Sequence, residues 1–223
     1  MTHRHGLILT SRLAFIYRQI FYYIGLSSRL KALLEDPVIS KQLFLPLPLA
    51  VPADQPVRNI YESKAWNAQV ERGIGRDPLS ESTFGTENGR RNIVLGLNID
   101  GFQPWRNIAR SLTPFVCMIY NLPENLRCKA EYMLMVALIP GPNEPKHFNP
   151  YLNFLVRELK SLYTEGILIQ DPCLDAKAAP VRVRVKLLNI VVDLPAHQHM
   201  LLQQGSSAFN GCHKCYIKVS DRS

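Results

Sequence analysis

Two aspartates, Asp100 and Asp193, each end a strongly apolar run of residues. A carboxylate at the tip of a buried strand can hold negative charge beside a rigid apolar sheet. Two such carboxylates together offer the hard oxygen ligands that Mg²⁺ prefers, and Mn²⁺ accepts the same donors. Enzymes that transfer phosphoryl groups with two metal ions use sites of this kind. The pattern therefore predicts a two-metal catalytic site at Asp100 and Asp193. The alternative is that each aspartate only caps the turn after its strand.

The elements that must position these aspartates can be inferred from hydrophobic periodicity. Alternating or continuous apolar residues predict strands, and leucines at helical spacing predict a helix. In chain order we expect strands at 92–100, 112–122 and 131–139, a helix at 148–163, and a strand from 181 to Asp193. An antiparallel meander of three strands, then a helix crossing to a fourth strand beside the first, is the ribonuclease-H-like topology. In that topology the two aspartates converge, with one hairpin or loop inserted in the crossover. We therefore predict an α/β fold with a partial ribonuclease-H-like mixed sheet.

The N-terminal part of the chain has a different character. Residues 11–45 are expected to be helical, and Ser27 or Ser28 is the expected N-cap of a helix there. The proline-rich stretch 46–57 is expected to be a loop, residues 60–70 a short helix, and the polar stretch 73–89 irregular. We therefore divide the chain into a flanking segment, 1–90, without a core of its own, and a catalytic core, 91–223. Limited proteolysis is expected to cut first within 46–57 or 73–89.

Composition and charge narrow the class of protein. The 223 residues are 47% hydrophobic and 20% charged, which is typical of globular domains. The net charge of +8 suggests an anionic partner such as DNA, although a solvated basic surface explains the charge as well. Five cysteines, an odd number, argue against a disulfide framework. The apolar stretch 7–26 contains Arg12 and Arg18, so it is too charged to span a bilayer. We expect an intracellular protein without a membrane partner.

Two further motifs suggest ligands. Arg182, Arg184 and Lys186 alternate with valines, so all three should lie on one side of a strand. That side is either a DNA-binding face that contacts phosphates or a solvated edge. Cys212-x-x-Cys215 has half the spacing of a zinc site, which needs four ligands, so we expect only a partial Zn site. His197 and His199 are alternative ligands, although a His-x-His pair this close to a catalytic aspartate more often packs or makes backbone hydrogen bonds.

Six short motifs, in this order along the chain, resemble those of CACTA (En/Spm) transposases. They are Asp100-Gly-Phe-Gln-Pro104, Tyr120-Asn-Leu-Pro123, Lys129-Ala-Glu-Tyr-Met133, Leu138-Ile-Pro-Gly-Pro142, Asp193-Leu-Pro-Ala196 and Gly211-Cys-His-Lys-Cys215. The resemblance covers about residues 20–217. It implies a nuclear, ribonuclease-H-like nuclease that cuts and joins transposon DNA with three acidic residues and divalent metal ions. Asp100 and Asp193 match the first two acids. An oligomer is a further possibility.

The sequence departs from that family pattern in its third acid. The resemblance places a glutamate after the Cys-x-x-Cys motif, whereas the residues after Asp193 include no Glu. Glu131 and Glu165 lie near apolar elements, but neither occupies the third-acid position. We therefore expect a truncated or degenerate copy, or a partial gene model. The competing function is a catalytically inactive remnant that acts as a DNA- or protein-binding module.

Overall fold

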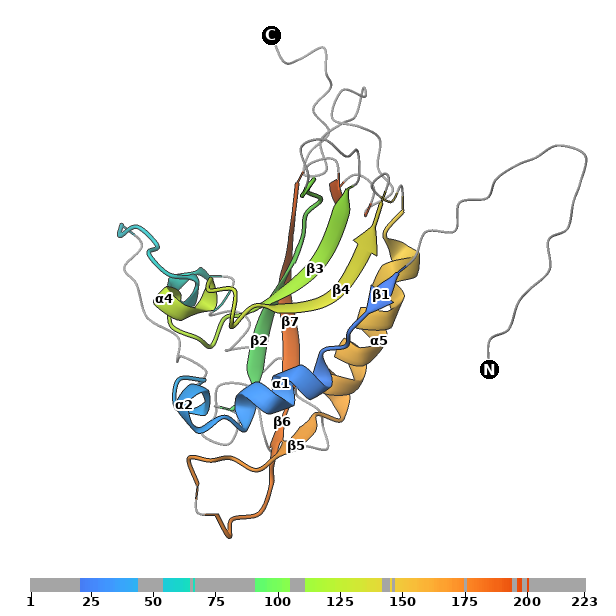
Figure 1. Cartoon of the computed structure of the whole chain (residues 1–223). Helices are drawn as coiled ribbons and strands as arrows, with labels where there is room; N and C mark the ends of the chain where they lie inside the picture. Colours follow the sequence, from blue (N-terminus) through green and yellow to red (C-terminus); the bar gives the residue numbers. More distant parts are fainter. Residues whose placement is uncertain are drawn as a thin grey trace, which may run out of the picture.

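The computed structural model of the chain describes residues 21–43, 54–64, 66, 91–104, 111–141, 145, 147–174, 176–193, 196–197 and 200. A five-stranded mixed sheet forms the centre of this part of the chain (Figure 1), in the order β1-β4-β3-β2-β7. Its strands are β1 (Tyr22–Tyr23), β2 (Ile93–Ile99), β3 (Leu112–Ile119), β4 (Leu134–Pro140) and β7 (Val185–Val192). β2, β3 and β4 form an antiparallel meander, and β7 runs parallel to β2. The meander and the parallel fourth strand beside the first strand, both expected from the sequence, are confirmed.

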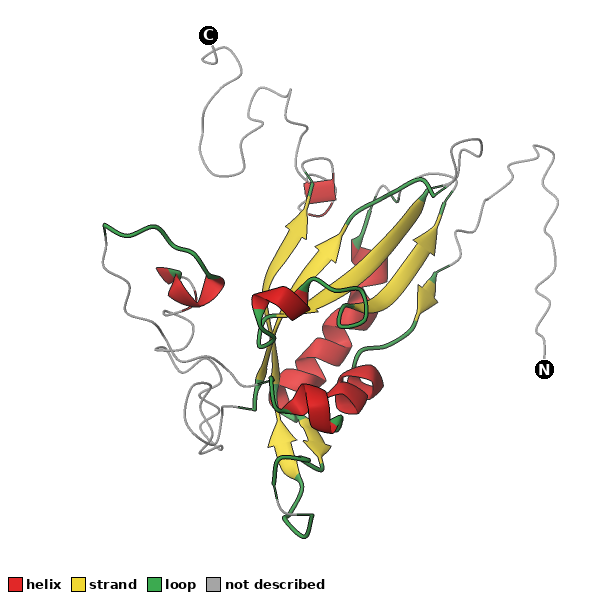
Figure 2. Cartoon of the chain, turned by 60° about the vertical axis from the view of Figure 1, so that its left-hand side comes forward, coloured by secondary structure: helices red, strands yellow, loops and turns green. Residues whose placement is uncertain are grey.

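Helix α5 (Asn149–Thr164) lies along one face of the sheet (Figure 2). Its four buried leucines are those on the predicted stripe: Leu152, Leu155, Leu159 and Leu162. They share one buried cluster with alternate residues of β2, namely Ile93, Leu95, Leu97 and Ile99. The helix ends before Gly166, whose φ of 72° lies in the left-handed region that glycine adopts without penalty. We call this face of the sheet the α5 face.

A second, smaller cluster covers the opposite face of the sheet. Val94, which alternates with Ile93 and Leu95 along β2, packs there with Tyr61, Trp66 and Tyr120. Tyr61 belongs to the 3₁₀ helix η1 (Ile60–Glu62), within the expected helix at 60–70. Lys64 and Trp66 are helical too, whereas residues 65 and 67–70 lie outside the described ranges. The Tyr61 hydroxyl donates hydrogen bonds to the carbonyls of Tyr120 and Leu122. We call this face the Tyr120 face.

The N-terminal segment corrects one expectation. Tyr22–Tyr23 form strand β1, which pairs with Ala137 and Leu138 of β4, whereas residues 11–45 were expected to be helical. Aromatic residues favour strands, and the free edge of β4 supplies the partner that the local pattern does not reveal. Helices α1 (Ser27–Leu34) and α2 (Pro37–Ser40) follow, and Leu30 and Leu34 are buried in the cluster beneath α5.

The start of α1 is capped by a residue distant in sequence. Neither Ser27 nor Ser28 is the N-cap; Leu26 takes that position without a side-chain cap. The Glu158 carboxylate of α5 instead accepts hydrogen bonds from Leu26 N at 2.9 Å and Ser27 N at 2.7 Å. It also accepts from the hydroxyls of Ser27 and Tyr23. α1 is therefore fixed to α5 at its first turn.

Two boundaries and one additional helix differ from the sequence-based expectation. β4 begins at Leu134 and not at residue 131, because Met133 N and Tyr132 N bond back to the Lys129 carbonyl in a turn. Helix α4 (Glu124–Arg127) precedes that turn and was not predicted. The expected last strand is divided at Arg184 into β6 (Val181–Val183) and β7. β6 pairs with β5 (Ile167–Ile169) in a separate two-stranded sheet, so the insertion in the crossover, expected to be a hairpin or a loop, is a hairpin.

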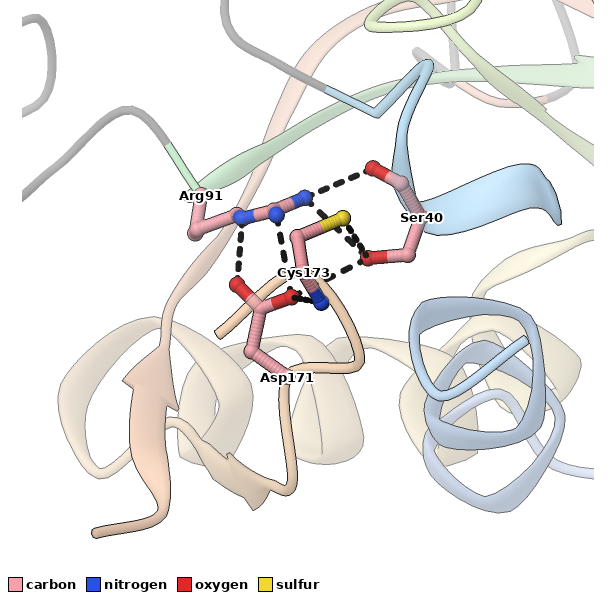
Figure 3. A network of polar contacts seen from close by, with 4 residues as sticks. All are labelled: Ser40, Arg91, Asp171 and Cys173. Atoms are coloured by element: carbon pink, nitrogen blue, oxygen red, sulfur yellow. Dashed lines mark hydrogen bonds and ion pairs between the residues drawn. The ribbon is translucent and has the colours of Figure 1, made fainter. Parts of the chain in front are cut away.

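A buried ion pair joins three distant segments (Figure 3). Arg91, just before β2, meets Asp171, after β5, with Nε to Oδ2 at 2.6 Å and Nη2 to Oδ1 at 2.9 Å. Arg91 Nη1 also donates to the Ser40 carbonyl at 2.6 Å, which connects the pair to α2. All three residues are buried. The bidentate geometry and the shared acceptors satisfy the buried charges.

Candidate metal centre

Asp100 and Asp193 follow the last paired residues of two neighbouring parallel strands. The β2–β7 register ends with Ile99 opposite Val192, so each aspartate comes one residue later at the same edge of the sheet. In Figure 1 this edge is at the top, away from the β5–β6 hairpin. Beyond Asp100 the pairing of β2 with β3 continues, because Phe102 and Leu112 exchange backbone hydrogen bonds of 2.9 and 2.8 Å. Both aspartates are exposed to solvent.

Asp193 also performs the turn-capping role that the sequence left open. Its Oδ1 accepts a hydrogen bond of 2.8 Å from Ala196 N, and its carbonyl accepts one of 2.9 Å from His197 N. The first bond orients the Asp193 carboxylate, and the second closes the turn after the strand. A carboxylate can accept about four hydrogen bonds or ligand contacts through its two oxygens. Capping through Oδ1 therefore leaves capacity for a cation.

The donor chemistry of the two aspartates fits a hard divalent ion. Mg²⁺ and Mn²⁺ take oxygen ligands, and Mg²⁺ commonly keeps several waters beside one or two carboxylates, which an exposed position allows. Within the described ranges, no group of three or more His, Cys, Asp or Glu residues gathers where it could hold a metal ion. Among the described residues, Asp100 and Asp193 are thus the candidate metal ligands at this edge of the sheet. Glu131 and Glu165 are both exposed, and the Ser161 hydroxyl donates to Glu165 at the end of α5.

The three basic residues of the last strand region differ in their surroundings. Arg182 is exposed, Arg184 is buried with 8% of its surface accessible, and Lys186 is half-buried. Arg182 donates to the Glu165 carbonyl, and Arg184 Nε approaches the Thr164 carbonyl at 3.5 Å. Cations there satisfy the last carbonyls of α5 and complement its dipole. Two of the three residues thus have a structural role at the helix end, which the alternation with valines does not reveal.

Lys186 lies in an open pocket between α5 and β7. The pocket is lined by Val156, Leu159, Lys160, Tyr163, Val185, Lys186 and Leu187. Partial burial, which disfavours the charged ammonium form, lowers the pKa of Lys186 to about 8.

Several candidate residues lie outside the part of the chain that the structure describes. They are Cys212, Cys215 and His199. His197 is described and half-buried, and its backbone N–H donates to Asp193. The partial Zn site therefore stays a prediction.

Sequence reasoning missed three groups of residues that shape this region. These are the Arg91–Asp171 pair, the Glu158 cap of α1, and a hydrogen bond of 3.0 Å from the Tyr120 hydroxyl to Asn189 Oδ1. In each group the partners are tens of residues apart in the chain, so no local spacing connects them. A buried charge in an otherwise apolar neighbourhood, such as Arg91 beside the run 92–99, was the available signal.

Comparison with known proteins identifies the family of the chain. The model of the transposase family tnp2 matches residues 76–222, about two thirds of the chain. The chain therefore belongs to this family of transposases. Neither the curated proteins nor the solved structures include a significant match. Among the described residues, no helix is long and apolar enough to cross a membrane.

Proposed function

We propose that this chain carries the ribonuclease-H-like part of a CACTA (En/Spm)-type DNA transposase, with Asp100 and Asp193 as two acidic ligands of its metal site. The main observation in support is the parallel pairing of β2 with β7, which ends one residue before each aspartate. The strand order β4-β3-β2-β7 and the crossover through α5 support the ribonuclease-H-like assignment. Membership in a transposase family supports DNA as the substrate.

The chemistry follows from the two carboxylates. When bound, Mg²⁺ or Mn²⁺ ions supply activation of the attacking oxygen and stabilisation of the leaving oxygen of a phosphodiester. Asp100 and Asp193 contribute negative charge at a solvent-accessible edge, where a DNA backbone can approach. The Ala196 amide orients the Asp193 carboxylate before any ligand arrives. Prior orientation of ligands lowers the entropic cost of assembling the site.

The basic residues support DNA binding as part of the same proposal. Residues 176–223 carry seven Lys and Arg against two Asp. Of the predicted DNA-binding residues, exposed Arg182 is the best placed for a phosphate, Lys186 is partly accessible, and Arg184 contributes mainly to the helix end. Such contacts give affinity that depends little on sequence and strongly on salt. A partial Zn site at Cys212 and Cys215, and a nuclear location, complete the proposed description.

A catalytically inactive DNA-binding module is the second candidate. One observation favours it: among the described residues, no third His, Cys, Asp or Glu joins Asp100 and Asp193 to complete a metal site. Losing one ligand of a metal site removes alignment of the attacking oxygen, and a misplacement of about 1 Å can cost on the order of 100-fold in rate. A site that holds metal ions with these two carboxylates alone is therefore expected to be inactive.

A paired DNA-binding and nuclease assay tests both candidates. The purified chain should bind duplex DNA with an affinity that falls steeply as salt rises. With Mn²⁺ it should cleave DNA at or near background, as should Asp100→Ala and Asp193→Ala. Robust cleavage that either substitution abolishes would show an active enzyme and a third acid supplied elsewhere in this chain. Failure to bind DNA even at low salt would contradict both candidates.

A further inference from the structure

Strand β7 contains one more residue than the part of β2 that it faces. Leu95 pairs with Leu187, and the next residue, Gly96, pairs with Asn189. Leu188 is therefore an extra residue, a β-bulge between two stretches of regular parallel pairing. Bulges are uncommon in parallel pairs, and they often serve to redirect side chains beside functional sites.

The packing of side chains shows what the bulge does. Leu187 and Val192 both pack against the cluster on the α5 face, although they are five positions apart. In a regular strand, residues an odd number of positions apart point to opposite faces. Leu188, in contrast, packs with the cluster on the Tyr120 face. The bulge thus shifts the alternation of β7 by one residue.

This shift determines the face on which Asp193 lies. Asp100 follows Ile99 and Asp193 follows Val192, and both preceding residues point to the α5 face. Alternation then places both aspartates on the Tyr120 face. Without the shift, Asp193 would share the face of Val185, which is the α5 face, and would be separated from Asp100 by the sheet.

A hydrogen bond across the sheet holds the bulge. The Tyr120 hydroxyl, at the end of β3, donates to Asn189 Oδ1 on β7 at 3.0 Å. The ring crosses β2 at Gly96, where an added Cβ would lie 2.6 Å from the Tyr120 hydroxyl oxygen and 2.9 Å from Asn189 Oδ1. Only glycine leaves room for this crossing. Tyr120 is itself fixed, because its backbone N–H donates to the Val94 carbonyl at 2.9 Å.

We infer that Tyr120, Gly96 and Asn189 are positioning residues that hold the Leu188 bulge and thereby keep Asp193 on the same face as Asp100. The consequence for metal binding depends on the proposed function. The geometric claim does not depend on it, because it concerns only which side chains share a face. The two can therefore be tested separately.

Disulfide mapping in the intact chain tests the geometric claim. Paired residues of neighbouring strands lie about 4.8 Å apart, which is within reach of a disulfide when both side chains share a face. Asp100→Cys/Asp193→Cys is compared with Asp100→Cys/Val192→Cys after mild oxidation, and mass spectrometry quantifies each linked peptide. We expect the link from 100 to 193 to exceed that from 100 to 192 by about tenfold, because Cβ atoms on opposite faces do not meet disulfide geometry.

Variants of the cross-sheet hydrogen bond then test the positioning residues. Tyr120→Phe removes only the hydroxyl, and Asn189→Val removes the acceptor and favours a regular strand. Each should lower the ratio of the 100–193 disulfide to the 100–192 disulfide about fivefold. This change corresponds to the loss of about one hydrogen bond. Asn189→Asp retains an acceptor and should preserve the preference. In a chain from which Leu188 is deleted there is no bulge to hold, so Tyr120→Phe should have no effect.

The outcomes separate the positioning claim from the metal site. An equal yield of the link to 192 in the parent chain would overturn the assignment of faces. A preference unchanged by both Tyr120→Phe and Asn189→Val would overturn the role of the hydrogen bond. Circular dichroism checks that each variant is folded. If the variant without Leu188 does not fold, Asn189→Asp serves as the control instead. If the link follows the expected pattern but Mn²⁺ binding is independent of Asp100 and Asp193, the positioning stands and the proposed site fails.

Discussion

Asp171 and Arg91 neutralise each other in a buried position where either charge alone would be unfavourable. Asp171→Asn removes the negative charge and leaves the Arg91 guanidinium buried without its counter-ion. We expect it to lower the free energy of unfolding by about 3–5 kcal/mol, as for other broken buried pairs. Urea denaturation followed by circular dichroism measures this loss.

Two control variants separate charge burial from loss of packing. Replacing both partners, as Arg91→Met/Asp171→Leu, should recover most of the stability, because apolar groups of similar volume need no counter-ion. Glu35→Gln disrupts the partly exposed Lys31–Glu35 pair but keeps an oxygen that can accept the hydrogen bond from Gln170 N, so it should change stability little. A double variant as unstable as Asp171→Asn would show that the network matters through its hydrogen bonds to Ser40 and not through charge.

Lys186 makes the stability of the protein depend on pH. Its pKa is lowered to about 8 in the folded state, whereas the ordinary value is 10.5, because partial burial disfavours the ammonium form. Between these values the unfolded chain binds more protons, so the contribution of Lys186 to stability rises with pH. Lys186→Met should therefore be more stable than the parent at pH 7, and this gain should shrink towards pH 10. Urea midpoints at both pH values measure it, with Lys160→Met as the control from the same pocket.

Among the elements, α1 depends on Glu158 for its first turn. Burial alone would raise the pKa of this carboxyl, but hydrogen bonds from Ser27, Tyr23 and the backbone outweigh it, and the pKa is lowered overall. Glu158→Leu should cost about 1 kcal/mol or more of stability, as does loss of other helix caps. Because the folded pKa is lowered, the difference between parent and variant should decrease as pH falls below the range of an ordinary glutamate. Glu165→Leu, an exposed glutamate just after α5, is the control.

The elements also show how far local pattern determines this fold. The leucine stripe of α5 and the apolar alternation of β2 predicted both elements, because each buries one face against the same core. β1 was missed, because a two-residue strand is specified by the free edge of β4 and not by its own sequence. The bulge at Leu188 was missed for a related reason: only the pairing with β2 shows that β7 has a residue too many. The local sequence thus predicted that both aspartates follow the ends of strands. The face of the sheet that they share depends instead on contacts between residues distant in the chain.

In the molecule as a whole, the segment before the family match shares a core with the sheet. The match begins at residue 76, yet Leu30 and Leu34 of α1 are buried beneath α5, and Ser40 accepts from Arg91. Protease should cut first within 46–57 or 73–89, as the sequence predicts, and the nicked fragments should stay associated. Gel filtration of the nicked protein, with and without urea, tests this. Release of the N-terminal fragment without denaturant would contradict the shared core.

The ends of β2 and β7 are proposed to bring two carboxylates together as a metal site. Titration of Mn²⁺ followed by electron paramagnetic resonance tests it directly, because bound and free Mn²⁺ give different spectra. The parent chain should bind Mn²⁺ weakly, and Asp100→Asn and Asp193→Asn should each reduce the affinity about tenfold or more, as expected when one of only two protein ligands is removed. Asp54→Asn, which changes an exposed aspartate away from these strand ends, should bind as the parent does. Equal Mn²⁺ affinity in the parent and in both strand-end variants would contradict the assignment of Asp100 and Asp193 as metal ligands.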